Sequence, residues 1–131
     1  WQGKKSMSML PKFLMVATGG AFGAMARYAV SLWVPVTAGF PWATFIVNVL
    51  GSLLIGVVYV VLVEKAAFPP FWRELLVVGF LGAFTTFSAF SIEAVNLIQN
   101  HEISVALVFV VSSVFFCIVA AVLGMSLARI F

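Results

Sequence analysis

The sequence has very little charge. Only 8% of its 131 residues are Asp, Glu, Lys or Arg, whereas 64% are hydrophobic. About a quarter of the residues in an ordinary soluble domain are charged, so this composition excludes that class. Because a membrane span needs roughly 20 apolar residues, the chain has room for four spans joined by short turns. We therefore expect an all-α integral membrane protein with four transmembrane helices.

Residues of the kind that make catalytic and metal sites are also scarce. The one cysteine, Cys117, lies in an apolar run, where it can form neither an internal disulfide nor a metal site, and we expect it to pack against other helices. His101 lies in a polar turn with no second His, Cys or Asp near enough to hold a metal. The spans contain no phosphate loop and no nucleophile–base pair. The sequence therefore predicts neither an enzyme nor a protein with an organic cofactor.

Four apolar segments follow one another along the chain. We predict spans at residues 13–34, 42–63, 71–98 and 103–127, separated by turns that contain proline, glycine or polar residues. In the first span, the spacing of Gly19 and Gly23 permits the close approach of another helix. Residues 1–10 have no long apolar core and resemble an added or flexible segment, so residues 11–131 are expected to form a single transmembrane domain.

The net charge of +3 comes mainly from residues at the ends of these segments. It therefore reports membrane topology and not nucleic-acid binding. Four spans place both termini on one side of the membrane. Six Lys and Arg residues outside the spans lie on that side and none lies opposite; four remain when residues 1–10 are left out. This modest bias predicts cytoplasmic termini.

The third segment has an unusual centre, residues 79–91, with the sequence GFLGAFTTFSAFS. Hydroxyl groups at the middle of an apolar span must face protein or water. Gly82, followed by the β-branched residues Thr85 and Thr86, marks a point where the helix could break, and freed backbone groups need partners in a bilayer. We predict a discontinuous helix that is broken near the midplane, with its two half-helix ends directed at an ion.

Beyond that point, 100° steps place Thr86, Phe87, Phe90 and Glu93 on one side of the helix. Two phenylalanines three residues apart usually pack against neighbours. Aromatic rings also carry a positive edge, so beside Thr and Ser hydroxyls they could replace the water around an anion. The sequence pattern agrees both with packing and with the lining of an anion path.

Three further polar residues lie inside the spans, and each has two or more interpretations. Arg27 either extends its side chain to the nearer surface or places a positive charge on an anion vestibule. Asn48 either makes an interhelical hydrogen bond or donates its amide N–H groups to a passing anion. Glu93 could reach the surface, pair with Arg27 or face a water-filled vestibule.

Three motifs together resemble one family, the small fluoride channels called Fluc or CrcB. They are GGAFGAMARY at residues 19–28, PWATFIVNVLGSLLIG at residues 41–56 and GFLGAFTTFSAFS at residues 79–91, and the resemblance covers nearly the whole chain from about residue 15. It implies an antiparallel homodimer of dual topology in the cell inner (plasma) membrane, with two pores along the subunit interface. Dual topology disagrees with the one-sided charge count, and we follow the family because that bias is modest.

The resemblance also implies roles for individual residues. Phe87 and Phe90 look like the phenylalanines whose ring edges line the fluoride path, Asn48 like its amide donor and Arg27 like its vestibule arginine. The resemblance also implies that Thr44, Ser113 and Glu93 belong to a polar track. A structural sodium ion is expected on the backbone carbonyls of Gly82 and Thr85 from both subunits. The expected partners are fluoride, a second copy of the chain and the lipid bilayer.

The function that follows is passive export of cytoplasmic fluoride, which protects a cell from fluoride toxicity. One alternative is a small multidrug-resistance-type exporter coupled to protons, which would need a carboxylate in its first span, where this chain has Arg27 and no acid. Another is a non-transporting assembly subunit, which would not need the polar centre of the third span.

Overall fold

The computed structural model describes residues 8–37 and 39–131. They form four helical stretches that are long and apolar enough to cross a membrane, Met9–Trp33, Trp42–Glu64, Arg73–Gln99 and Ile103–Ile130. The prediction of an all-α protein with four membrane spans is thus confirmed, and the chain is a multi-pass membrane protein. The first span starts at Met9, four residues before its predicted start, so residues 9 and 10 of the expected N-terminal segment are helical. Residues 1–7 of that segment lie outside the described residues.

Within these stretches the structure distinguishes seven elements. The first span is α1 (Met9–Trp33) and the last is α5 (Ile103–Ile130). The second span consists of α2 (Trp42–Tyr59) and a π-helical end, η1 (Val60–Glu64). The third has three parts, the π-helix η2 (Arg73–Leu81), the short α3 (Gly82–Phe84) and α4 (Phe87–Gln99).

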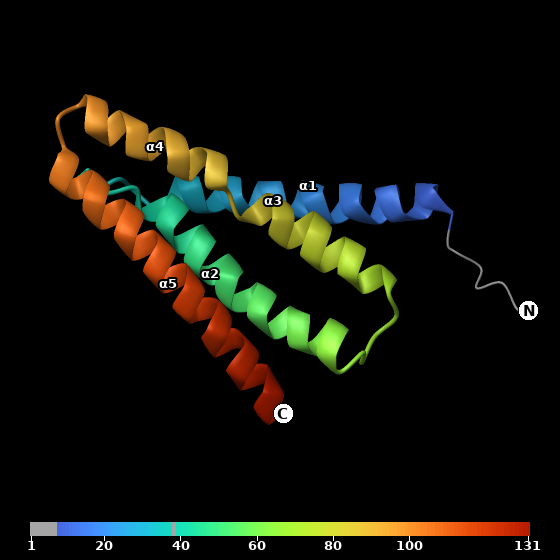
Figure 1. Cartoon of the computed structure of the whole chain (residues 1–131). Helices are drawn as coiled ribbons and strands as arrows, with labels where there is room; N and C mark the ends of the chain where they lie inside the picture. Colours follow the sequence, from blue (N-terminus) through green and yellow to red (C-terminus); the bar gives the residue numbers. More distant parts are fainter. Residues whose placement is uncertain (1–7, 38) are drawn as a thin grey trace, which may run out of the picture.

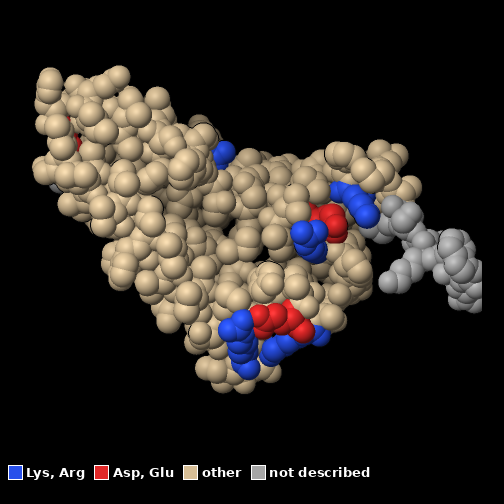
Figure 2. Space-filling view, viewed as in Figure 1, with Lys and Arg blue, Asp and Glu red and all other residues tan. Residues whose placement is uncertain are grey.

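Both ends of the described chain lie on the same side of the molecule as the turn that joins the second and third spans (Figure 1). The other two turns lie at the opposite end. Most of the Lys, Arg and Glu side chains visible in Figure 2 gather on the side of the termini. Glu64 and Arg129 form a salt bridge there, in which the Arg129 Nε donates to Glu64 Oε2 at 2.9 Å. The arrangement agrees with the sides deduced from the sequence.

Glycines permit two close helix crossings. A Cβ on Gly19 or Gly23 of α1 would overlap the carbonyl oxygens of Leu75 and Phe80 in the third span. Where α2 meets α5, a Cβ on Gly56 or Gly124 would likewise overlap main-chain carbonyls of the other helix. Lipid gives helices no hydrophobic reason to associate, so this backbone-to-backbone packing supplies much of their attraction. The glycine spacing in the first span therefore has the packing role that the sequence indicated.

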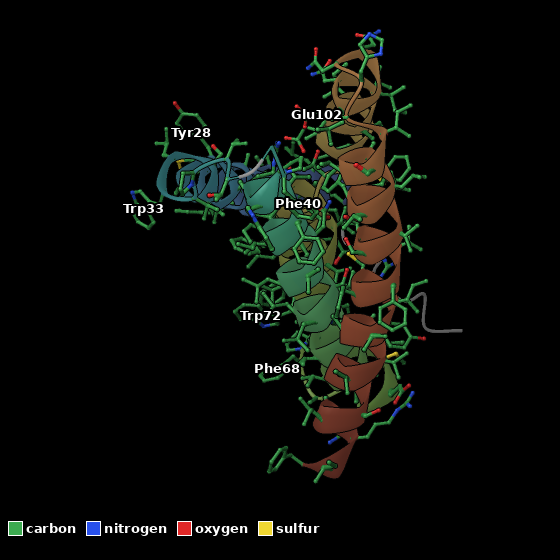
Figure 3. All side chains as sticks on the ribbon, turned by 90° about the vertical axis from the view of Figure 1, so that its left-hand side faces the viewer. Tyr28, Trp33, Phe40, Phe68, Trp72 and Glu102 are labelled. Atoms are coloured by element: carbon green, nitrogen blue, oxygen red, sulfur yellow. The ribbon has the colours of Figure 1, made fainter. Side chains whose placement is uncertain are left out.

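The third span changes its partner half-way along. Its first half, η2 with α3, packs on α1, whereas its second half, α4, packs on α5. The contact of α4 with α5 forms the buried apolar cluster of Ala94, Leu97, Ala106 and Phe109. Helix α1 extends to one side of the other helices, and its Tyr28 and Trp33 project away from them (Figure 3). The change of partner requires a bend in the third span, and the candidate site lies at that bend.

Candidate functional site

The third helix is broken at Thr85 and Thr86, as predicted. Helix α3 ends at Phe84, and both threonines have extended backbone angles, with φ −81° and ψ 155° for Thr85 and φ −151° and ψ 115° for Thr86. Helix α4 then begins at Phe87, capped by the Thr86 hydroxyl, which accepts a hydrogen bond of 3.1 Å from the Ala89 N–H. β-Branched residues favour extended backbone, which explains why the break falls at this pair.

Asn48 of α2 holds the break in place with two hydrogen bonds. Its Oδ1 accepts from the Thr86 N–H at 2.8 Å, and its Nδ2 donates to the Thr86 carbonyl at 3.0 Å. The amide thus satisfies the N–H of Thr86, which has no helical partner and must be paired inside a bilayer, and adds a hydrogen bond to the carbonyl of this helix-capping residue. The interhelical hydrogen bond expected as one alternative for Asn48 is therefore present. An amide nitrogen carries two hydrogens, so one N–H of Asn48 remains available to a ligand.

Arg27 of α1 supports the other side of the break. Its Nε donates to the carbonyl of Ala83 at 3.1 Å, within the last turn before the break. A helix end of this kind carries partial negative charge, which a cation stabilises. Arg27 makes no salt bridge with Glu93; within the described residues, the salt bridge that forms joins Glu64 to Arg129. The ion pair considered for Glu93 from the sequence is therefore absent.

A cavity of about 400 Å³, here called the groove, lies beside the break between α2, the third span and α5. Four of the predicted pathway residues line it, namely Asn48, Phe87, Phe90 and Ser113. The rings of Phe87 and Phe90 lie 5.4 Å apart, and Phe87 is 79% exposed. Ser113 is only 5% exposed, and its buried hydroxyl has no hydrogen-bond partner among the described residues. The rest of the lining consists of Gly51, Ser52, Ile55, Val77, Leu81, Gly82, Thr85, Thr86, Val114, Cys117 and Ile118.

A second cavity of about 230 Å³, here called the side cavity, lies between α1, α2 and α4. The other three predicted pathway residues, Arg27, Thr44 and Glu93, line it. The Thr44 hydroxyl donates to Glu93 Oε1 at 2.9 Å, whereas the buried Glu93 Oε2 finds no partner in the described part of the chain. Thr86 lines both cavities, so the break separates them.

The structure thus divides residues that the sequence had placed on one face. A helical wheel drawn through residues 85–93 put Glu93 beside Phe87 and Phe90. All three residues lie on α4, where steps of 100° per residue put Glu93 roughly 60° around the helix from Phe90 and roughly 120° from Phe87. The wheel had grouped them on one broad face, whereas the structure divides that face between the groove, which Phe87 and Phe90 line, and the side cavity, which Glu93 lines.

The break also frees the two carbonyl groups that were predicted to hold sodium. In a continuous helix, the N–H groups of Thr86 and Ala89 would bond to the carbonyls of Gly82 and Thr85. Here the Thr86 N–H donates to Asn48 and the Ala89 N–H donates to the Thr86 hydroxyl. Gly82 and Thr85 both line the groove. Carbonyl oxygens of this kind suit a hard cation, so the residues fit the predicted ion.

Sequence reasoning missed two features of the site. One is the Ala83 carbonyl as the partner of Arg27, for which the sequence has no signal, because any backbone carbonyl can accept a hydrogen bond. The other is Cys117, which lines the groove. Its position four residues after Ser113 could have indicated this, since residues four apart share one face of a helix.

Comparison with known proteins agrees with these observations. The model of one family, described as "CrcB-like protein, Camphor Resistance (CrcB)", matches residues 14–125. The chain belongs to this family. It is also similar to the protein of Saccharophagus degradans named "Fluoride-specific ion channel FluC", at 53% identity over 89% of this chain and 89% of that protein. Proteins of the same name from Hahella chejuensis and Thermus thermophilus are 46% and 44% identical; these matches cover 92% and 86% of this CrcB-family chain and 97% and 90% of the relatives.

Proposed function

We propose that this protein is a passive, fluoride-selective ion channel, and not an enzyme. The relatives that share 44–53% of its residues over most of both chains bear the name of a fluoride-specific ion channel. The structural observation that carries the proposal is the groove at the break of the third helix. It brings the aromatic rings of Phe87 and Phe90 together with the hydrogen-bond donors Asn48 and Ser113 in one cavity.

The chemistry of the groove suits a small anion. Neither an acidic nor a basic side chain lines it, so a passing anion meets no repelling charge and no counter-ion that would trap it. The unpartnered Ser113 hydroxyl and the second N–H of Asn48 can donate to the anion, while the ring edges of Phe87 and Phe90 present partial positive charge. Fluoride is small and strongly hydrated, so it gains more from each donor than chloride does in a narrow path.

Transport of this kind needs no chemical energy. Hydrogen fluoride is a weak acid that crosses membranes in its neutral form and dissociates in the less acidic cytoplasm, which traps fluoride. A membrane potential that is negative inside then drives the anion out by about 2.3 kcal/mol per 100 mV. A channel in the cell inner membrane would therefore protect the cell from fluoride without ATP.

The channel would be an antiparallel homodimer with its two pores at the subunit interface. The exposure of Phe87 supports this assembly, because an aromatic ring that is 79% exposed beside a polar groove leaves one wall of the path open in a single chain. The freed carbonyls of Gly82 and Thr85 support it as well, since two oxygens are too few for a hard cation and a second copy would double them. A sodium ion held there would fix the two breaks against each other.

The experiment that tests the function is anion efflux from liposomes that contain the purified protein. The potassium ionophore valinomycin allows charge to balance, and electrodes outside follow fluoride and chloride in parallel. We expect rapid release of fluoride without chloride, and no release from protein-free liposomes. If a folded protein released neither anion, the channel proposal would be wrong, and proton-coupled export of cationic drugs would be tested next.

A further inference from the structure

We propose that Cys117 is a modification site in the groove, at which a small thiol-reactive compound that enters from water forms a covalent adduct and stops fluoride flux. This inference rests on the proposed function, since the flux that stops is that of the channel. The sequence alone had indicated only packing for this residue.

The position of Cys117 supports the proposal. It is a free, partly buried cysteine on α5, and its neighbours in the groove include Asn48, Phe87 and Phe90. The cavity of about 400 Å³ is more than ten times the roughly 30 Å³ that one water molecule occupies in the liquid, so a small organic group can enter it. An adduct at this position would fill space between the break and α5.

Ser113 provides an independent indication that a polar ligand occupies this level of the groove. Its hydroxyl oxygen is buried without a partner and lines the same cavity, one helical turn before Cys117. A buried hydroxyl without a partner is destabilising, so it indicates a ligand or water that passes or rests there. The thiol of Cys117 therefore lies next to a position where an ion would be held.

The reaction needs only the cysteine and the reagent. The thiol loses its proton to water, and the thiolate attacks the sulfur of a methanethiosulfonate that carries an anionic sulfonatoethyl group, which suits the donors of the groove. A disulfide forms between Cys117 and the reagent sulfur, and methanesulfinate leaves with the electron pair of the broken bond. A dithiol reductant reverses the modification.

The test treats the reconstituted full-length protein with this membrane-impermeant reagent and measures intact mass and fluoride efflux on the same sample. For the wild type we expect the mass of one adduct and a fall in efflux of about tenfold or more, because the adduct narrows the path. The reductant should restore both. The Cys117→Ser variant should gain no mass, and its efflux with and without reagent should agree.

A matched control moves the thiol to another face of the same helix. Val122 is exposed on α5 and does not line the groove, so the double variant Cys117→Ser, Val122→Cys places a cysteine outside the groove. We expect its efflux to be insensitive to the reagent. Equal loss of efflux in this variant would show that the groove is not the site of block.

Two outcomes would overturn the proposal. An adduct that forms only after denaturation would show that Cys117 cannot be reached from water, and an adduct with unchanged efflux would show that it lies off the anion path. A wild-type protein that releases no fluoride before treatment would contradict the proposed function instead. The mass measurement on that folded protein would still decide whether the groove is a modification site.

Discussion

The two cavities beside the broken helix differ in their chemistry. The groove contains donors, hydroxyls and aromatic rings but no ionisable acid or base other than the Cys117 thiol, whereas the side cavity holds Arg27 and Glu93. Each side contributes one side chain that bonds to the broken backbone, Asn48 from the groove and Arg27 from the side cavity. The break is therefore secured from both sides, but only one side offers an anion a path without charged groups.

This difference indicates that the two cavities have different functions. An anion that crosses a membrane needs hydrogen-bond donors strong enough to replace its water shell. The same donors must be weak enough to let the anion move on. The groove meets that need with neutral donors. The side cavity instead contains the Arg27 guanidinium and the ionisable carboxyl group of Glu93, so an anion there would meet a charged group. We therefore expect substitutions in the groove to affect conduction and substitutions in the side cavity to affect stability.

The largest effect is expected from Phe87→Ile and Phe90→Ile. Each change introduces a β-branched apolar side chain and removes an aromatic ring from the groove, so fluoride loses a group that replaces its water. We expect fluoride efflux from liposomes to be abolished while size-exclusion chromatography shows an unchanged assembly.

Phe115→Ile is the matched control, because Phe115 is 58% exposed on α5 and does not line the groove. Its efflux should remain at the wild-type rate. Wild-type efflux in both Phe87→Ile and Phe90→Ile would show that the rings only pack, and the ring-edge mechanism would have to be abandoned.

The position of the break could be predicted from the sequence, whereas the division into two cavities could not. Thr85 and Thr86 are β-branched residues after a glycine inside an apolar span, which is a local signal, and the structure places the break there. Which cavity each side chain enters depends on how α4 is rotated relative to α3. That rotation is set by the contact of α4 with α5, which lies far along the chain.

Candidate residues were predictable as a set but their contacts were not. All seven expected pathway residues line one of the two cavities. Arg27 and Glu93, however, share the side cavity without forming the ion pair that was considered, because Arg27 donates to the Ala83 carbonyl and Glu93 accepts from Thr44. Such choices between partners depend on distances of a few ångströms between helices, which a sequence pattern does not contain.

A smaller but still large effect is expected from Asn48→Asp. The carboxylate cannot donate to the Thr86 carbonyl, and its negative charge in the groove repels fluoride. Fluoride efflux should fall by about two orders of magnitude, because a repulsion of about 3 kcal/mol corresponds to roughly a hundredfold in rate. The same change at Asn96, an exposed residue of α4 outside both cavities, is the control and should leave efflux unchanged. A wild-type rate for Asn48→Asp would mean that Asn48 serves only to hold the break.

The smallest effect on conduction is expected from Arg27→Met, which tests the side cavity directly. Methionine is of similar length but cannot donate to the Ala83 carbonyl, and loss of a charged hydrogen bond costs about 1.5–3 kcal/mol. The midpoint of thermal unfolding in detergent should therefore fall below that of the control Arg73→Met, which removes an exposed arginine. Fluoride efflux should fall by less than about tenfold, because Arg27 lies outside the groove and can affect fluoride only through its long-range charge. If Arg27→Met instead abolished efflux with an unchanged midpoint, fluoride would have to pass the side cavity as well, and the proposed division between the two cavities would be wrong.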